Sequence, residues 1–233
     1  MKFAVIGTGK TGSCILKLLP KQEVLYAFNS QNPPTVAKLK QVDASIVFVT
    51  GPVMQSMIPS LLEAKRPLVT GSTNIKWPPH LNEELIQLGI PWIHANNFSI
   101  GMNLLFHMSS VVARSLPLFD DSTLHIKEHH HKDKKDTPSG TSLKLQEIMG
   151  DAGIKIHSTR QGEHAGEHTL ELSTPQETLT LTHQARDRTL YAKGAIWAAQ
   201  ELLWQPSLKG LISFEDLVGS LLLNKKEADK HDQ

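Results

Sequence analysis

The segment Gly7–Gly12 (GTGKTG) constrains the fold most, because of what stands on either side of it. It follows a short apolar, β-prone run, Lys2–Ile6, and precedes Ser13–Leu19, where apolar residues recur at helical spacing. A strand, a glycine turn and a helix in this order are typical of a dinucleotide-binding unit, whose glycines let the backbone approach a pyrophosphate. The alternative is a tight turn without a ligand. A phosphate-loop NTPase motif is excluded by spacing, because it needs a glycine where Ala4 stands.

Residues 13–100 continue the alternation of strand and helix. The predicted elements are strands at Glu23–Phe28, Ser45–Thr50, Pro67–Thr70 and Pro91–His94, and a helix at Met57–Ala64. Strands that alternate with helices in this way predict a parallel sheet covered on both faces.

Ligands of such a sheet bind beyond the carboxyl ends of its strands, so the polar turns there are candidate contacts. These turns are Thr50–Pro52, Gly71–Thr73 and Asn96–Phe98, although ordinary turn chemistry accounts for any one of them alone. The second strand of a dinucleotide-binding domain normally ends in an acid for the adenosine ribose, or near an Arg for a 2′-phosphate. Asn29–Asn32 supplies neither, so the choice between NADH and NADPH stays open.

Composition argues against several other classes of protein. Lys and Arg number 24 against 23 Asp and Glu, so no global field favours nucleic acid or an anionic membrane surface. The single cysteine, Cys14, excludes an intrachain disulfide framework and fits a reducing compartment. Because the N-terminus runs directly into a predicted strand, we expect no signal peptide, and no apolar run nears the ~18 residues that span a bilayer. We therefore expect a cytoplasmic protein with no nucleic-acid or membrane partner.

The stretch Lys127–Thr141 (KEHHHKDKKDTPSGT) gathers histidines and lysines ahead of a Pro-Ser-Gly-Thr turn. Alternation of apolar and polar residues predicts a strand over Ser122–Glu128, which puts the histidines at or just beyond its end. A helix is predicted over Ser142–Met149, with Ser139 or Thr141 as its N-cap. The basic loop is thus aimed at a helix N-terminus.

Three interpretations of this loop compete. Zinc is disfavoured, because neighbouring side chains on an extended chain point to opposite faces and no ligand pair with zinc spacing follows. A solvated charge run is the second interpretation, since lysines usually face water. An anion site for carboxylate groups is the third, and it explains both halves of the motif. Its donors would be His130, His131, Lys134 and the backbone amides of Gly140 and Thr141. A histidine and a lysine can also supply a proton to a reacting centre.

The pattern His130-His131-x-x-Lys134-x-Asp136-x-Pro138-Ser139-Gly140-Thr141 is similar to the signature of the dihydrodipicolinate reductase family. The other segments that resemble the family are Gly7–Gly12, Thr50-x-Pro52, Gly71–Thr73, Asn97–Asn103 and His183–Ala199. The resemblance implies an α/β fold, with a Rossmann-type parallel-sheet domain and an α+β substrate and oligomerisation domain that has a mixed sheet. It assigns residues 1–100 and 205–233 to the dinucleotide-binding domain and residues 101–204 to the second domain. It also implies a homotetramer.

Roles for individual residues follow from the same resemblance. His130 and Lys134 correspond to the catalytic pair, with Lys134 as the immediate proton donor and His130 supporting or sharing that role. The implied contacts to substrate carboxylates are His131, Lys134, Gly140 and Thr141. The implied cofactor contacts are Gly7, Thr8, Gly9, Lys10, Thr11, Gly12, Gly71, Ser72, Thr73, Ala95, Asn96, Asn97 and Phe98. No metal is expected.

The implied reaction uses NADH or NADPH to reduce 4-hydroxy-tetrahydrodipicolinate, a small dicarboxylate, to tetrahydrodipicolinate in the diaminopimelate route to lysine. A catalytically silent nucleotide-binding protein of the same fold is the alternative. The sequence departs from the family pattern where Lys10-Thr11 replaces an Arg-Met pair and His129 replaces a small residue. Arg188 matches a late arginine of the family, for which a structural and a substrate-proximal role stay equally open.

Three further features carry expectations. His164 and His168 have helical spacing, but the glycines between them favour a loop or a turn. Trp197 and Trp204 fall on an apolar helix and are expected in the core. Ser213–Leu223 is predicted to be an amphipathic helix with acidic residues in its first turn.

Overall fold

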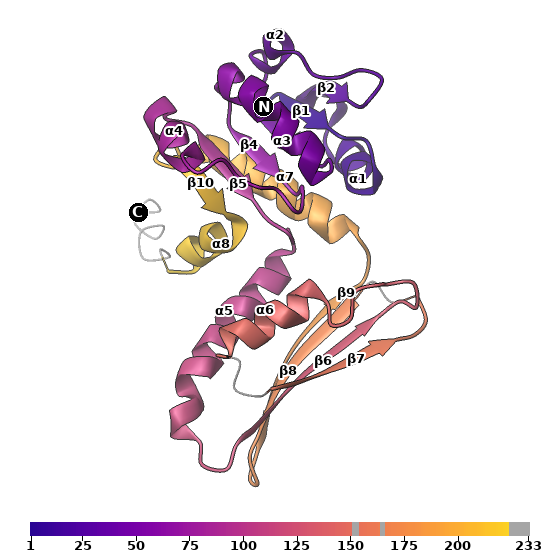
Figure 1. Cartoon of the computed structure of the whole chain (residues 1–233), viewed down its shortest axis with the longest axis vertical. Helices are drawn as coiled ribbons and strands as arrows, with labels where there is room; N and C mark the ends of the chain where they lie inside the picture. Colours follow the sequence, from indigo (N-terminus) through magenta and orange to yellow (C-terminus); the bar gives the residue numbers. More distant parts are fainter. Residues whose placement is uncertain (151–153, 164–165, 224–233) are drawn as a thin grey trace, which may run out of the picture. The chain divides into compact units, whose positions relative to one another are not determined.

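The computed structural model describes residues 1–150, 154–163 and 166–223, and the chain divides into two compact units (Figure 1). The first unit consists of Met1–Ile100 together with the described chain from Thr189 on, and the second is Gly101–Arg188. His164, for which the sequence predicts a loop or a turn, lies outside the described residues. Among the residues that the structure describes, no helix combines the length and apolarity that a membrane span needs.

The first unit is built on a six-stranded sheet in the order β10-β5-β4-β3-β1-β2, in which every pair of neighbours is parallel. Its strands are β1 (Phe3–Ile6), β2 (Val24–Phe28), β3 (Ala44–Val47), β4 (Leu68–Thr70), β5 (Pro91–His94) and β10 (Gly210–Ser213). Every residue of β1, β3 and β4 is buried, which explains their nearly continuous apolar sequences.

Helices cover both faces of this sheet, as the alternation of strand and helix predicted. They are α1 (Lys10–Leu18), α2 (Val36–Leu39), α3 (Gly51–Ala64), α4 (Leu81–Leu88), α7 (Thr189–Trp204) and α8 (Phe214–Leu223), with a short 3-10 turn η1 (Lys21–Glu23). Phe3 and Val5 of β1 pack in one apolar cluster with α1 and α7, whereas Ala4 and Ile6 pack in a second cluster with α3 and α4. Two layers of helices therefore enclose a Rossmann-type sheet.

The return of the chain to the first unit differs from the expected boundary at residue 205. Helix α7, in orange beside the N-terminal elements in Figure 1, packs on α1, β3 and β4 and thus belongs to the first unit. Small residues explain the close packing, because Ala192 and Ala195 are fully buried and a Cβ on Gly194 would collide with the carbonyl oxygen of Phe98. Trp197 is partly buried against this core, as expected, but the prediction for Trp204 is wrong, since it is 60% exposed.

The second unit has a four-stranded mixed sheet in the order β7-β6-β8-β9, with β6 and β7 parallel and the other pairs antiparallel. Its elements are α5 (Ile100–Ser115), which starts at the last residue of the first unit, η2 (Leu116–Leu118), β6 (Thr123–His130), α6 (Gly140–Ile148), β7 (Lys155–Arg160), β8 (Gly166–Ser173) and β9 (Thr178–Ala185). Helices α5 and α6 lie on one face of the sheet (Figure 1). The core of the unit, which includes Phe106, Ile126 and Leu170, lies between these helices and the sheet.

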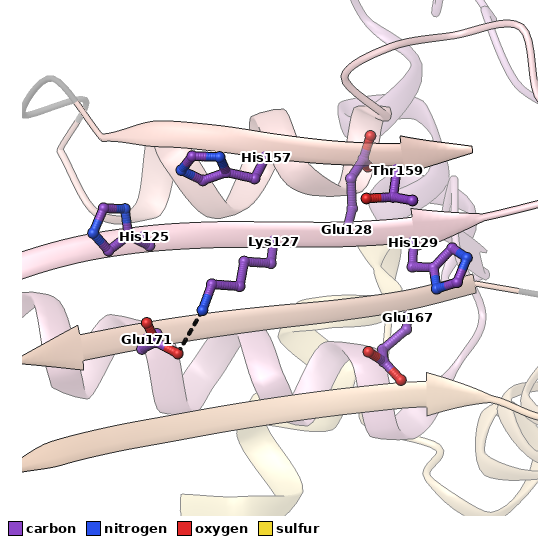
Figure 2. A pocket seen from close by; sticks show the side chains of 8 residues that line it. All are labelled: His125, Lys127, Glu128, His129, His157, Thr159, Glu167 and Glu171. Atoms are coloured by element: carbon purple, nitrogen blue, oxygen red, sulfur yellow. Dashed lines mark hydrogen bonds and ion pairs between the residues drawn. The ribbon is translucent and has the colours of Figure 1, made fainter. Parts of the chain in front are cut away.

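Strand β6 alternates between this core and the opposite face. Ile126, Glu128 and His130 are buried, whereas Lys127 between them is exposed. Successive side chains of a strand point to opposite faces, so the strand carries a carboxylate and an imidazole on its core side. Figure 2 shows the opposite face, where an open hollow is lined by His125, Lys127, His129, His157, Thr159, Glu167 and Glu171, and Glu128 borders it from the core side of β6.

Candidate active site

The glycine turn at the end of β1 is tight on its inner side and open above. Gly7 has a φ of +97°, and its N–H donates to the carbonyl oxygen of Phe28 at 2.9 Å. A Cβ on Gly12 would collide with the carbonyl oxygen of Gly7, whereas a Cβ on Gly9 would meet no non-neighbouring atom of the described residues within 4 Å. The first turn of α1 begins here with free amide groups, which suit a pyrophosphate. This cradle fits a dinucleotide.

The other candidate cofactor residues follow β4 and β5. The N–H of Gly71 donates to the carbonyl oxygen of Val47 at 3.1 Å, which ties the end of β4 to the end of β3. The N–H of Ala95 donates to the carbonyl oxygen of Thr70 at 3.1 Å, which ties β5 to β4 in the same way. Since β1, β3, β4 and β5 are parallel neighbours, the structure brings these turns to one edge of the sheet.

Polar side chains near this edge stabilise the turns themselves. The Oγ of Ser72 accepts from the N–H of Val49 at 3.3 Å, and the Oδ1 of Asn97 accepts from the N–H of Ser99 at 2.9 Å. After β2, the Oδ1 of Asn29 accepts from the N–H groups of Gln31 and Asn32, each at 2.9 Å. The Nζ of Lys38 lies 5.8 Å from the ring centre of Phe28. No acidic side chain stands directly after β2.

The basic loop of the second unit runs from the end of β6 to the start of α6. His130 is the last residue of β6 and is buried, and the half-buried Lys134 follows in a turn closed by its own N–H on the carbonyl oxygen of His131 at 3.2 Å. The Nζ of Lys134 lies 2.8 and 2.9 Å from the carboxylate oxygens of Asp136. The predicted proton donors and the predicted anion site thus lie on a single short segment.

Helix α6 begins as the Pro-Ser-Gly-Thr turn predicts. Ser139 is its N-cap, because the Oγ accepts from the N–H of Ser142 at 3.2 Å. The amides of Gly140 and Thr141 occupy the first turn, where helix N–H groups have no partner within the helix. Gly140 is exposed, and His131 and Thr141 are half-buried, so this helix N-terminus is accessible to a small anion.

A buried hydrogen-bond network centred on Glu128 supports this loop, and the sequence did not reveal it. We call it the Glu128 network, and its members are Glu128, Ser139, Ser142, Arg160 and His168. The carboxylate of Glu128 accepts from the Nη2 of Arg160 at 2.6 Å and from the Oγ of Ser142 at 2.7 Å. Both of its oxygens also lie 3.2 Å from the N–H of Ser139.

His168 completes the network from a neighbouring strand. The expectation that it lies in a loop or turn is wrong, because it lies within β8 and is buried. Its Nε2 is 3.2 Å from the Oγ of Ser139, and its ring centre is 4.9 Å from that of His130 in an edge-on arrangement. Only the antiparallel pairing of β6 with β8 brings these two histidines together, so spacing along the chain gave no signal.

Burial and charge set the protonation of these groups. Burial, together with the charges of Lys134 and Arg160, lowers the pKa of His130 to about 4 although Glu128 opposes the shift. Burial lowers the pKa of His168 to about 3. Burial alone would raise the pKa of Glu128, but hydrogen bonds from Ser139 and other donors outweigh it and hold the pKa far below its usual range. At neutral pH the two histidines are neutral and the carboxylate is charged.

One cluster in the described part of the chain has the composition of a metal site. Ligand atoms of Glu128, His130 and His168 all lie within 4.8 Å of one another. The oxygens of Glu128 already accept from Arg160, Ser142 and the Ser139 backbone, so a cation would have to displace these donors. The arrangement is therefore that of a hydrogen-bond network.

The remaining candidates lie apart from this network. His129 points to the opposite face of the sheet, where its Nε2 lies 3.1 Å from the carbonyl oxygen of Gln161 (Figure 2). Arg188 is exposed at the end of the second unit, so its side chain is held by no core packing.

Comparisons with known proteins agree with this architecture. Residues 101–218 match the family model described as dihydrodipicolinate reductase, C-terminus. The 4-hydroxy-tetrahydrodipicolinate reductase of Rickettsia rickettsii is 32% identical over 90% of this chain and 95% of its own length, and that of Methanocorpusculum labreanum is 30% identical over 90% and 86%. The structure of dipicolinate-bound dihydrodipicolinate reductase from Paenisporosarcina sp. TG-14 superposes with a TM-score of 0.76 at 19% identity, over 93% of this chain and 99% of that one. The chain belongs to the 4-hydroxy-tetrahydrodipicolinate reductase family of oxidoreductases.

Proposed function

We propose that the protein uses NADH or NADPH to reduce 4-hydroxy-tetrahydrodipicolinate, after loss of water, to tetrahydrodipicolinate in the biosynthesis of diaminopimelate and lysine. The observation that carries the proposal is the basic loop, on which Lys134 is paired with Asp136 a few residues before the accessible N-terminus of α6. A lysine ammonium and free helix amides are suited to a carboxylate. The relatives are named for this reaction, and the family membership gives the substrate class its support.

The proposed cofactor contacts are the turns at one edge of the first unit's sheet. The amides of Lys10, Thr11 and Gly12 at the start of α1 bind the pyrophosphate, and Gly9 leaves room for it. The turns Gly71–Thr73 and Ala95–Phe98 hold the nicotinamide half. When bound, the reduced nicotinamide supplies a hydride. Because β2 ends without an acid that would reject a 2′-phosphate, we propose that both NADH and NADPH are accepted.

In the proposed reaction, the hydride and one proton add across a double bond of the dehydrated ring. Lys134 donates the proton from its Nζ, which the carboxylate of Asp136 holds at the start of the loop. His130 is neutral at neutral pH, so it assists Lys134 and is not the main acid. His131 and the amides of Gly140 and Thr141 hold a substrate carboxylate. General acid catalysis of this kind typically contributes ~10²–10⁴-fold to a rate.

We also propose a cytoplasmic homotetramer. In the second unit, both helices lie on one face of the sheet, and the described residues of that unit leave the polar face of Figure 2 without a helix over it. A sheet face of this kind is available to a second copy of the chain. Sedimentation velocity on the purified protein measures the subunit number, and a monomer at micromolar concentration would contradict the proposed assembly.

The test of the reaction is oxidation of NADH or NADPH, followed at 340 nm, on addition of freshly generated 4-hydroxy-tetrahydrodipicolinate. We expect turnover with both cofactors. A folded protein that binds the nucleotide but shows no turnover with either would instead be a catalytically silent nucleotide-binding protein. Nucleotide binding is measured separately by titration calorimetry, so loss of binding and loss of chemistry are distinguished.

A further inference from the structure

Glu128 occupies an unusual place for a carboxylate, since its side chain is fully buried beneath the basic loop. Its two oxygens receive donors from β7, from the turn before α6 and from α6 itself, through Arg160, Ser139 and Ser142. A buried charge is costly unless it is paired and hydrogen-bonded. Two of these donors, Ser139 and Ser142, belong to the segment that carries the proposed catalytic and carboxylate-binding groups. The third, Arg160, belongs to β7, which pairs with β6.

Arg160 extends this anchorage to the other side of the loop. Its Nη2 donates to Glu128 at 2.6 Å and to the backbone carbonyl oxygen of Asp136 at 2.7 Å. The pair thus holds two points of the loop, the carbonyl of Asp136 and the N–H of Ser139, at fixed positions relative to β6. Lys134 lies two residues before the first anchor, and Gly140 directly follows the second.

Glu128 also faces the buried side of His130. The Nδ1 of His130 lies 3.8 Å from the Oε2 of Glu128, and among the described residues this Nδ1 has no hydrogen-bond partner. A carboxylate at this place favours the tautomer of His130 that carries its proton on Nδ1 and leaves Nε2 as the acceptor. The Nε2 of His130 approaches Gly166, the first residue of β8.

We propose that Glu128 and Arg160 are positioning residues of the reductase, which hold Lys134 and the amides of Gly140 and Thr141 in the geometry that the reaction needs. This inference rests on the proposed function and adds residues to it. Neither residue touches the substrate in the proposal, and both act through the loop that they hold. A displacement of about 1 Å in a reacting group can cost ~10²-fold in rate, so loss of the anchors is expected to be visible in turnover.

The principal test replaces both charges at once, in the variant Glu128→Leu/Arg160→Met. Single substitution leaves one buried charge without its partner and destabilises strongly, whereas replacing both members of a buried pair by apolar residues is often neutral. We expect a folded protein that binds NADPH within about twofold of the wild type but has a ~10²-fold lower kcat and a raised KM for the dicarboxylate. A double variant that folds and turns over like the wild type would overturn the proposal.

Two readouts separate positioning from a merely structural role. Proton transfer becomes slower when Lys134 is misplaced, so the solvent deuterium isotope effect on kcat is expected to rise in the double variant. Hydrogen exchange in peptides that cover residues 131–142 is expected to accelerate, while exchange in β8 stays unchanged. Unaltered exchange in residues 131–142 would contradict the anchoring role even without any substrate.

Matched variants complete the design. Glu147→Leu makes the same substitution at an exposed position of α6, and we expect its kcat within twofold of the wild type. Arg160→Lys keeps the charge but loses the planar fork, so its kcat should fall between those of the wild type and the double variant. If the wild type itself shows no turnover, the proposed function fails, whereas wild-type turnover with a fully active double variant rejects only the positioning role.

Discussion

The glycine turn of the first unit and the basic loop of the second unit form their candidate sites in opposite ways. The glycine turn is made of backbone, and its shape depends on the absence of side chains at Gly7 and Gly12. The basic loop is made of side chains, and its shape depends on the buried charge of Glu128. The first site is therefore sensitive to added volume, and the second to lost hydrogen bonds and altered charge. Each prediction below tests one side of this difference.

The largest effect is expected from Lys134→Ala. Loss of the proposed proton donor should lower kcat by ~10²–10⁴-fold, because that is the usual contribution of general acid catalysis. NADPH affinity should stay within about twofold, since the glycine turn is untouched. Steady-state kinetics and calorimetry measure the two quantities. Lys135→Ala is the control, because Lys135 is the exposed neighbour, and equal losses in both variants would show a general charge effect.

Next in size is Gly12→Ala. Its added methyl group would collide with the carbonyl oxygen of Gly7, so the turn and the start of α1 must shift. Overpacking of this kind typically costs ~1–3 kcal/mol. Thermal unfolding followed by tryptophan fluorescence is suited to the measurement, because all four tryptophans belong to the first unit. An unchanged melting temperature would contradict the close packing at this glycine.

A smaller and more selective effect is expected from Gly9→Val. In the described part of the chain, no atom beyond the neighbours of Gly9 lies within 4 Å of a Cβ built there, so the melting temperature should change little. The new side chain would occupy the space proposed for the pyrophosphate, and the Kd for NADPH should rise by ~10-fold or more, which equals about 1.4 kcal/mol. Gly9→Ala is the matched control with a smaller expected rise. Tight NADPH binding by Gly9→Val would locate the cofactor elsewhere.

A further effect is a pH dependence in the stability of the second unit. His130 and His168 have folded-state pKa values of about 4 and about 3, below the ordinary value of 6.5, because both are buried. The unfolded chain binds protons that the folded unit does not, so stability is complete above pH 6.5 and is lost as the pH falls toward 4. Each histidine contributes at most about 1.4 kcal/mol per pH unit.

Hydrogen exchange in β6 and β8 measures this loss, while tryptophan fluorescence monitors the first unit in the same samples. His168→Gln removes one of the two histidines and keeps a hydrogen-bonding group next to Ser139, so the stability of the second unit should fall less steeply between pH 6.5 and 4. If the stability of the second unit falls equally steeply in the wild type and in His168→Gln, another group takes up the proton.

Local patterns in the sequence account for much of the fold. Strands β1 to β5, the glycine turn and an N-cap at Ser139 or Thr141 each depend on residues a few positions apart, and each was predicted, whereas β10 was not. The N-terminus of α8 was predicted in the same way, since the Oγ of Ser213 accepts from the N–H of Asp216 at 3.0 Å. These signals are short-range, so a single chain suffices to find them.

Two wrong predictions show what local sequence patterns do not determine. Helix α7 was assigned to the second domain, because nothing in its sequence says which surface its alanines pack against. Trp204 was expected in the core and is exposed, because it stands on the last turn of that helix. In both cases the side chains are apolar as expected, but their environment depends on packing with distant segments.

The sequence by itself determined the alternation of strand and helix over residues 1–100, the glycine turn and the basic loop that ends at a helix N-terminus. Only the tertiary structure decided that Arg160 from β7 and His168 from β8 meet Glu128 of β6 beneath that loop. The physical reason is that strand pairing joins residues far apart in the chain, and alternation along a strand fixes which face a residue takes but not which partner it meets.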